Sequence, residues 1–174
     1  GKPDLNPGRK DVFSALIRSI ISQQISTRAA SSVYNKFQNL YSTSTISPQL
    51  VLNTTDTKLK SAGLSRQKIE YIKSTAKFFN ATKYTYEDFN SMEDVKLKEE
   101  LITIKGVGPW TIDMLLIFSL GRSDIFPVGD LAIRNGFKIL FNKKHTEKQM
   151  IKEAKKWILE ALKNGSNITK CKIS

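Results

Sequence analysis

Two glycines separated by one residue, Gly106 and Gly108, lie between two helical stretches and are followed by Pro109. Glycine adopts positive φ readily and lets the backbone approach a ligand closely. The helix after the turn directs its N–H groups, and the positive end of its dipole, toward whatever occupies the turn. This geometry suits a phosphate group. A plain connection between two helices uses similar glycines, so the pattern by itself leaves both interpretations open.

Composition limits the other chemistry that the chain can carry. Its 174 residues include 28 Lys and Arg against 16 Asp and Glu, and this charge of +12 favours a polyanionic partner such as nucleic acid without identifying one. A single cysteine, Cys171, and a single histidine, His145, exclude an internal disulfide framework, a cysteine-rich zinc site, a four-cysteine iron–sulfur cluster and any site that needs several imidazoles. No apolar run reaches the roughly 18 residues of a membrane span, and no signal peptide opens the chain. We therefore expect an intracellular protein without a membrane partner.

Apolar residues recur with a helical period along almost the whole chain, and no segment alternates as a strand does. One stripe runs from Phe13 to Ile21 and another from Ala29 to Phe37, on either side of the polar segment 22–26. Ser26 and Thr27, just before the second stripe, are candidate N-caps of that helix. The pattern also predicts helices that begin at Ser47, end at Gly63, begin at Ser65, end at Leu101, span Pro109–Leu120, begin at Asp130 and follow a capping box at Thr146. Residues 80–92 are predicted to form a loop. The chain is therefore predicted to be all-α.

Four blocks of sequence, in this order and spacing, resemble one known family. They are residues 16–26 (LIRSIISQQIS), 62–65 (AGLS) with Lys68, 104–120 with Gly-Val-Gly-Pro-Trp-Thr, and 124–136 with Pro-Val-Gly-Asp. The chain thereby resembles the helix-hairpin-helix/Gly-Pro-Asp (HhH-GPD) superfamily of base-excision DNA glycosylases. Within that superfamily it looks most like the 3-methyladenine DNA glycosylase II (alkylpurine) branch.

The resemblance implies one helical glycosylase domain over residues 1–174, with two lobes and the active-site cleft between them. One lobe is expected to comprise about residues 1–25 and 125–174. The other is expected to comprise about residues 26–124, with the hairpin at 101–120.

By resemblance, Asp130 is the catalytic carboxylate. Breaking an N-glycosidic bond builds positive charge on the deoxyribose, and a carboxylate beside it stabilises that charge or activates the attacking water. The position of Asp130 at the start of a helix also suits an N-cap, and the two roles are compatible.

Trp110 indicates the subclass. Family members that also cleave the DNA backbone carry a lysine there as Schiff-base nucleophile, so a tryptophan implies a monofunctional enzyme that leaves an intact abasic site. The indole also suits a cationic alkylated base, through stacking and cation–π attraction, although a role as core filler remains open. Met114, one turn later, and Asp113 are expected to line the same base pocket. For Asp113, a helix-surface carboxylate is the alternative.

Extrusion of a base from the duplex leaves a gap that the protein must fill. Gln24, in the polar break between the first two helices, matches the intercalating position of the family. Leu64 is expected to assist from the opposite strand. The alternatives are a capping glutamine and a buried loop leucine.

The resemblance assigns sequence-independent phosphate contacts to the hairpin, together with backbone carbonyls that often hold a monovalent cation in this family. The expected phosphate-binding residues are Lys105, Gly106, Val107, Gly108 and Thr111, and the expected ligands of Na⁺ or K⁺ are the carbonyls of Ile102, Ile104 and Val107. We expect no required cofactor and no iron–sulfur cluster.

The implied function is hydrolysis of the N-glycosidic bond of alkylated bases, of the 3-methyladenine and 7-methylguanine type, in duplex DNA during base excision repair. The enzyme is expected to be a monomer, cytoplasmic in a prokaryote or nuclear in a eukaryote. A non-catalytic helix-hairpin-helix DNA-binding module is one alternative, and Asp130 argues against it. A bifunctional glycosylase/lyase for oxidised bases is another, and Trp110 and the missing cluster cysteines argue against that.

Overall fold

The computed structural model describes residues 11–43, 45–122, 125–142 and 144–163, and within these ranges it contains helices and no strand. The predicted all-α class is therefore confirmed. The helices are α1 (Val12–Ser22), α2 (Thr27–Gln38), α3 (Pro48–Asn53), α4 (Asp56–Ser61), α5 (Arg66–Thr82), α6 (Tyr86–Ser91), α7 (Asp94–Leu101), α8 (Pro109–Phe118), α9 (Leu131–Phe141) and α10 (Glu147–Lys163). None of these helices is both long enough and apolar enough to cross a membrane.

The described helices belong to two compact units, one within residues 7–122 that contains α1–α8 and one within residues 123–174 that contains α9 and α10. This grouping differs from the expected lobes for residues 11–25, which were expected with the C-terminal helices and lie in the first unit. The physical reason is that α1 packs against α2, α5 and α8, so its apolar surface is buried within the first unit.

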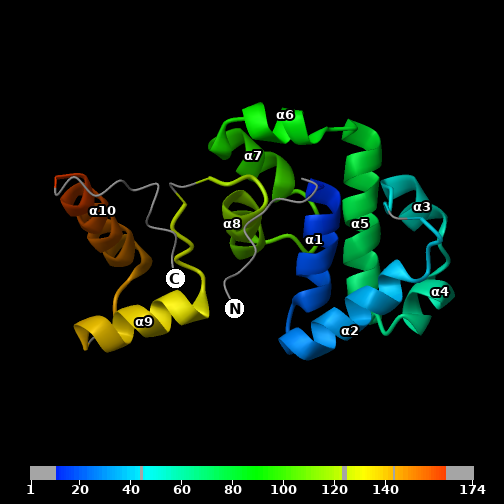
Figure 1. Cartoon of the computed structure of the whole chain (residues 1–174), viewed down its shortest axis with the longest axis horizontal. Coiled ribbons are helices and arrows are strands. Elements are labelled where there is room, and N and C mark those ends of the chain that lie inside the picture. Colours follow the sequence, from blue (N-terminus) through cyan, green and yellow to red (C-terminus); the bar gives the residue numbers. More distant parts are fainter. Residues whose placement is uncertain (1–10, 44, 123–124, 143, 164–174) are drawn as a thin grey trace. The chain divides into compact units, whose positions relative to one another are not determined.

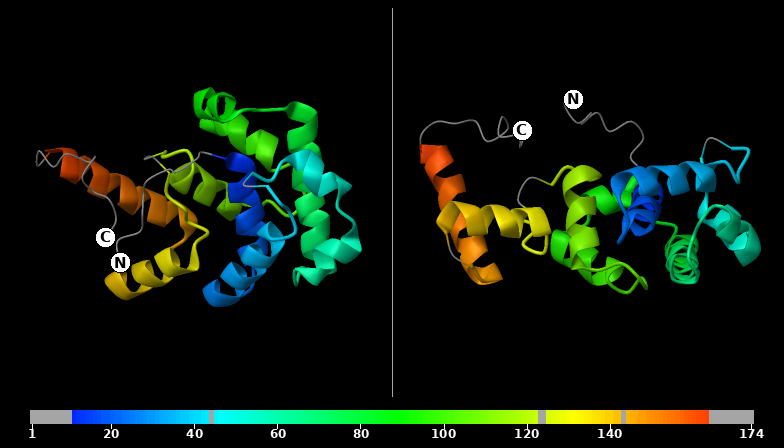
Figure 2. Two further views of the ribbon diagram at one scale, coloured as in Figure 1. Left: turned by 45° about the vertical axis from the view of Figure 1, so that its right-hand side comes forward. Right: turned by 90° about the horizontal axis from the view of Figure 1, so that it is seen from below.

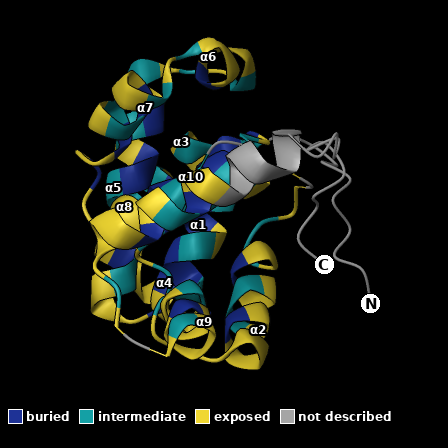
Figure 3. Ribbon diagram, turned by 90° about the vertical axis from the view of Figure 1, so that its left-hand side faces the viewer, coloured by how far each residue is buried: buried dark blue, intermediate teal, exposed yellow. Residues whose placement is uncertain are grey.

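The core of the 7–122 unit is built around α1 and α5. Figure 1 shows these two helices side by side and running in opposite directions, and both views in Figure 2 keep them adjacent. The buried residues of α1 recur on one side with the predicted helical period: Val12, Phe13, Leu16, Ile17, Ile20 and Ile21. Figure 3 shows this concentration of buried residues along α1, in contrast to the mostly exposed α9. Burial of the amphipathic stripe is therefore what fixes α1 against α5.

Side-chain caps define where most of these helices begin. The hydroxyls of Ser26, Ser47 and Ser65 accept first-turn amides of α2, α3 and α5, so these predicted caps are confirmed. The predicted left-handed residue after α4 is confirmed too, since Gly63 has a φ of +89°. These local signals are strong because each one satisfies backbone groups that the helix itself leaves unpaired.

The prediction of a loop over residues 80–92 is wrong, because α6 occupies Tyr86–Ser91. Thr85 and Asp88 form a reciprocal capping box at its start, in which the Asp88 carboxylate accepts from the Thr85 amide at 2.7 Å. A helix of 6 residues is too short to show a periodic apolar stripe, so only the capping box signals it in the sequence.

The 123–174 unit has a small aromatic core of its own. The Phe137 ring lies 5.8 Å from the rings of Phe126 and His145 and 5.4 Å from that of Phe141, measured between centroids. The predicted capping box at the start of α10 is confirmed, since the Thr146 amide donates to the Gln149 side chain at 2.8 Å and the Gln149 amide donates back to the Thr146 hydroxyl at 3.3 Å.

Candidate functional site

The glycine turn forms the predicted hairpin between α7 and α8. Gly106 has a φ of +88°, and its Cα faces the ring of Tyr71 from α5 so closely that a Cβ there would lie 2.2 Å from Tyr71 Cγ. Gly108 is the N-cap residue of α8 and has no side chain with which to cap the first-turn amides, and Pro109 has no N–H. The N-terminus of α8 therefore keeps the character of an anion-binding end.

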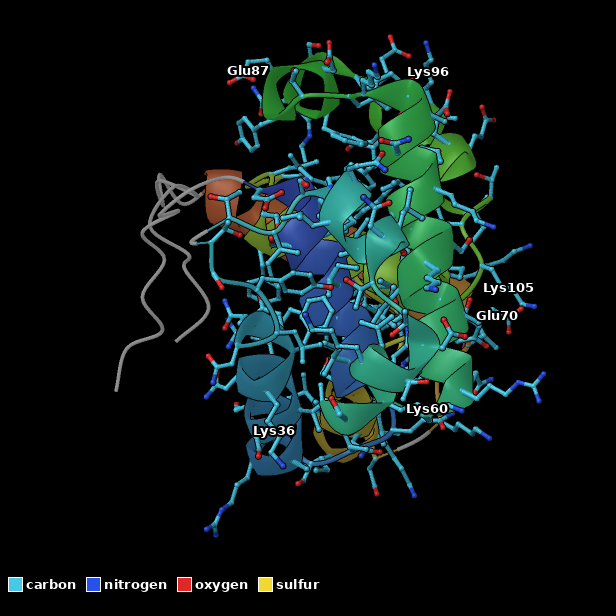
Figure 4. The ribbon with its side chains drawn as sticks, turned by 90° about the vertical axis from the view of Figure 1, so that its right-hand side faces the viewer. Lys36, Lys60, Glu70, Glu87, Lys96 and Lys105 are labelled. Carbon is cyan, nitrogen blue, oxygen red and sulfur yellow. The ribbon has the colours of Figure 1, made fainter. Side chains whose placement is uncertain are left out.

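Lys105 is held along α5. Its ammonium donates to Glu70 Oε1 at 2.6 Å, which raises the pKa of Lys105, and its backbone amide donates to Ser74 Oγ at 3.1 Å. Figure 4 shows the Lys105 and Glu70 side chains next to each other on the surface. Both groups are exposed, so such a pair contributes little to stability and can exchange partners. The expected phosphate contact of Lys105 stays a prediction that requires this exchange.

Two other members of the expected phosphate set, Val107 and Thr111, have buried side chains, so only their backbone groups are suited to such a contact. Among the expected cation ligands, the carbonyl of Ile104 accepts the amide of Val107 at 3.0 Å and so has one lone pair committed. Uncharged carbonyl oxygens suit a weakly coordinated monovalent ion, and the cation site stays a prediction.

The polar break between α1 and α2 is a short turn that places Gln24 on the surface in a left-handed conformation, with a φ of +60°. That conformation costs about 1–2 kcal/mol for a residue with a Cβ. The neighbouring Gln23 reaches across to the hairpin, where its Nε2 donates to the carbonyl of Gly106 at 3.0 Å. The structure thus brings the expected wedge residue next to the expected phosphate-binding turn. A cavity of about 430 Å³ lies between them, lined in part by Gln24, Lys68 and Gly108.

Leu64 does not share this exposure. Only 4% of the residue is accessible, and it belongs to the core of the 7–122 unit. The alternative interpretation, a buried loop leucine, describes its position. The residues on either side, Gly63 and Ser65, are exposed and form the surface of the turn between α4 and α5, whereas the apolar side chain of Leu64 is buried.

A larger cavity of about 690 Å³ opens between α1, α2 and α8. Trp110 and Met114 line it, as expected for a base pocket, and Trp110 is 38% exposed rather than packed in the core. Arg18 and Tyr34 line it as well, with the Arg18 guanidinium 5.4 Å from the centre of the Tyr34 ring. A cavity of this size and mixed character suits a small planar ligand.

Asp113 lies on a different side of α8. Its carboxylate pairs with Lys98 of α7 at 3.0 Å, and only 13% of its side chain is exposed. Because one residue along a helix is a rotation of about 100°, Asp113 faces α7 while Met114 faces the cavity. The expectation that Asp113 lines the base pocket is therefore corrected to a structural role at the α7–α8 interface.

Asp130 caps α9 in the 123–174 unit. Its Oδ1 accepts the amides of Ala132 at 2.9 Å and Ile133 at 3.1 Å, and its own amide donates to the Pro127 carbonyl at 2.9 Å. The expected N-cap is confirmed. The residue is half-buried, and its carboxylate lies at the positive, N-terminal end of the α9 dipole.

Three further residues line these two cavities, although no pattern in the sequence assigns a role to them: Lys68, Gln23 and Arg18. Lys68 Nζ donates to the carbonyl of Ile21, at the C-terminal end of α1, at 2.5 Å. Two features of the sequence could have indicated a role for Lys68. It belongs to one of the blocks that resemble the family, and a positive charge in the first turn of a helix does not stabilise the dipole of that helix.

Comparison with known proteins gives a consistent result. Residues 17–160 match the family model described as HhH-GPD superfamily base excision DNA repair protein. The DNA-3-methyladenine glycosylase 1 of Schizosaccharomyces pombe is 34% identical over 141 residues, which cover 80% of this chain and 62% of that protein. The DNA-3-methyladenine glycosylase of Saccharomyces cerevisiae is 34% identical over 158 residues, which cover 84% of this chain and 52% of that protein. The chain thus spans little more than half the length of these curated relatives.

Among solved structures, the 3-methyladenine DNA glycosylase of Schizosaccharomyces pombe in complex with abasic DNA superposes with a TM-score of 0.74 at 33% identity. The match covers 83% of this chain and 72% of that chain.

Proposed function

The chain belongs to the HhH-GPD superfamily of base excision DNA repair proteins, and from this premise we propose that it is a monofunctional DNA glycosylase that removes alkylated bases, of the 3-methyladenine and 7-methylguanine type, from duplex DNA. The observation that carries the proposal is Asp130, whose carboxylate is fixed at the N-terminus of α9 directly after the Pro-Val-Gly turn. A monomer that works inside the cell, on chromosomal DNA, is part of the same proposal.

The reaction breaks the bond between C1′ of the deoxyribose and the base nitrogen, and water supplies the oxygen that replaces it. A base alkylated at N3 or N7 carries a positive charge, so it leaves as a neutral molecule with the bonding electrons and needs no general acid. Positive charge then resides on the sugar, where the Asp130 carboxylate stabilises it and accepts the proton of the incoming water. A carboxylate held by two helix amides is preorganised for this role.

Trp110 supplies the surface on which the base stacks. Its exposed indole in a cavity with Met114 offers an aromatic face to a cationic ring, an attraction of about 0.5–2 kcal/mol. Backbone amides at Gly106 and Gly108 hold the phosphates beside the lesion, and Gln24 fills the gap that the extruded base leaves. The carbonyls of Ile102, Ile104 and Val107 would hold a monovalent cation, which would help to order the turn. The proposal includes no redox cofactor.

Release of individual methylated bases from alkylated duplex DNA tests this function, with the Asp130→Asn variant as the comparison. Asparagine caps a helix about as well as aspartate, so the variant is expected to lose less than about 1 kcal/mol of stability. Its rate of base release is expected to fall by at least about 100-fold, as when one charge-stabilising group is removed from an active site. Near-normal release by Asp130→Asn refutes the catalytic role.

The same assay separates the alternatives. A non-catalytic DNA-binding module binds methylated DNA but releases no base from it. A bifunctional lyase cleaves the strand in step with base release and forms an adduct that borohydride traps, whereas a protein with Trp110 in place of the nucleophilic lysine is expected to do neither.

A further inference from the structure

The free backbone carbonyls at the end of α1, next to the turn that carries Gln24, accept hydrogen bonds mostly from residues of that same turn. α1 ends at Ser22, and the last four carbonyls of a helix lack partners inside it. Three of these four carbonyls accept from donors in residues 22–25: those of Ser19, Ile20 and Ser22. Such local bonds close the turn, but they do not fix its direction relative to the rest of the unit.

The remaining carbonyl, that of Ile21, is satisfied from a distant helix. Lys68, in the first turn of α5, donates to it from Nζ at 2.5 Å across 47 residues of sequence. The ammonium thus lies at the negative end of the α1 dipole, where a cation is stabilised. Its half-buried position lowers the pKa of Lys68. A lysine held in this way is a fixed support and not a mobile surface charge.

The same face of α5 also supports the hairpin. Tyr71, one turn after Lys68, packs against Gly106, and Ser74, one turn further, accepts the amide of Lys105 at 3.1 Å. Gln23, in the α1–α2 turn, joins this turn directly to the hairpin, because its Nε2 donates to the Gly106 carbonyl at 3.0 Å. One helix face therefore sets the relative positions of the α1–α2 turn and the hairpin.

We propose that Lys68 and Gln23 are positioning residues for Gln24. They hold Gln24 in its left-handed conformation within the turn at residues 23–26 and join this turn to the hairpin, so that phosphate binding and insertion of Gln24 into the duplex occur as one event. The inference rests on the wedge role of Gln24 in the proposed function. Neither Lys68 nor Gln23 is required to touch the damaged base.

The test uses the full chain and compares binding of an abasic duplex with binding of an undamaged duplex of the same length. The Lys68→Met variant is expected to bind the abasic duplex about tenfold more weakly, equivalent to about 1.4 kcal/mol, and to bind the undamaged duplex unchanged. The dependence of binding on salt is expected to keep its slope, because no phosphate contact is lost. Lys68→Arg, which keeps the charge, is expected to restore binding. Gln23→Leu, which removes only the bond to Gly106, is expected to behave as Lys68→Met does.

A double-mutant comparison identifies the route of the effect. In a Gln24→Ala background the wedge is already absent, so Lys68→Met is expected to change abasic-site affinity by no more than about twofold. A full tenfold loss in that background overturns the proposal. So does an equal loss on both duplexes with a salt slope reduced by about one, since that result identifies Lys68 as a phosphate ligand.

Hydrogen exchange of the free protein separates failure of this inference from failure of the proposed function. Lys68→Met is expected to speed exchange of the Ile25 amide by about tenfold, with the amides of α5 unchanged. Unchanged exchange at Ile25 refutes the positioning role alone. Equal affinity of the wild-type protein for both duplexes refutes the wedge role, and the inference with it.

Discussion

Replacing Gly106 by alanine adds a methyl group where the hairpin presses on α5. Two effects combine. A Cβ on a backbone with a φ of +88° costs about 1–2 kcal/mol. The added carbon would lie 2.2, 2.3 and 2.7 Å from three carbons of Tyr71, and relief of such overpacking typically costs about 1–3 kcal/mol. The expected loss is therefore about 2–5 kcal/mol, a large part of the stability of a typical domain.

Urea denaturation followed by circular dichroism measures this loss, with Gly108→Ala as the matched control. Gly108 has a φ of −105°, and a Cβ there would meet nothing within 4 Å. Only a weaker N-cap is expected from that change, at most about 1 kcal/mol. In a Tyr71→Ala background the steric part disappears, and Gly106→Ala is expected to cost only about 1–2 kcal/mol. If Gly106→Ala destabilises the wild-type chain no more than Gly108→Ala does, the close contact with Tyr71 is not a real constraint.

Three further perturbations test other features of the structure. Asp113→Ala removes the pair with Lys98 and is expected to cost about 1 kcal/mol in urea denaturation while base release stays unchanged; a large drop in release would return Asp113 to the base pocket. Arg122 donates to the carbonyls of Asn90, near the end of α6, and of Met92, the residue that follows α6, and it pairs with Asp94 of α7. Arg122→Met removes all three interactions and is expected to cost about 1–3 kcal/mol in the same assay, and full stability in that variant would show that these interactions do not stabilise the fold. Hydrogen bonds from Thr85 lower the pKa of Asp88 below its ordinary value of 3.8. The stabilisation that they provide is therefore complete above pH 3.8 and is lost as the pH falls through the lower folded-state pKa. The urea midpoint of Asp88→Asn is expected to fall less on acidification than that of the wild type, and equal falls would contradict this.

Features set by neighbouring residues were predictable from the sequence. The α1 stripe, the Ser26 and Ser65 caps and the Gly63 turn follow from apolar periodicity and from the needs of unpaired backbone groups at helix ends. The hairpin turn follows in the same way from Gly106 and the residues around it. Helix α6 was not predicted, because a single capping box without a periodic apolar stripe is a weak signal of a helix.

Features set by distant residues were not predictable. Whether Leu64 faces a ligand or the core depends on what packs behind the loop, and the partner of Asp113 depends on how α7 lies against α8. The ammonium of Lys105 meets Glu70 only because the hairpin rests on α5. A single sequence does not show directly which distant residues contact each other in the folded chain. Family resemblance supplied the proposed roles of Asp130 and Trp110, which local patterns alone would not have assigned.

The contacts that hold the Gln24 turn and the hairpin together also bear on how the chain folds. They join residues 83, 47 and 31 positions apart: Gln23 with Gly106, Lys68 with Ile21, and Lys105 with Ser74. Loops of this length must close before such contacts form, so we expect them late in folding, after the helices themselves. A chain with its helices formed but its tertiary contacts incomplete would then lack the surface that the Gln24 turn and the hairpin form together. A ligand that binds it would stabilise only the completed fold and would slow its opening.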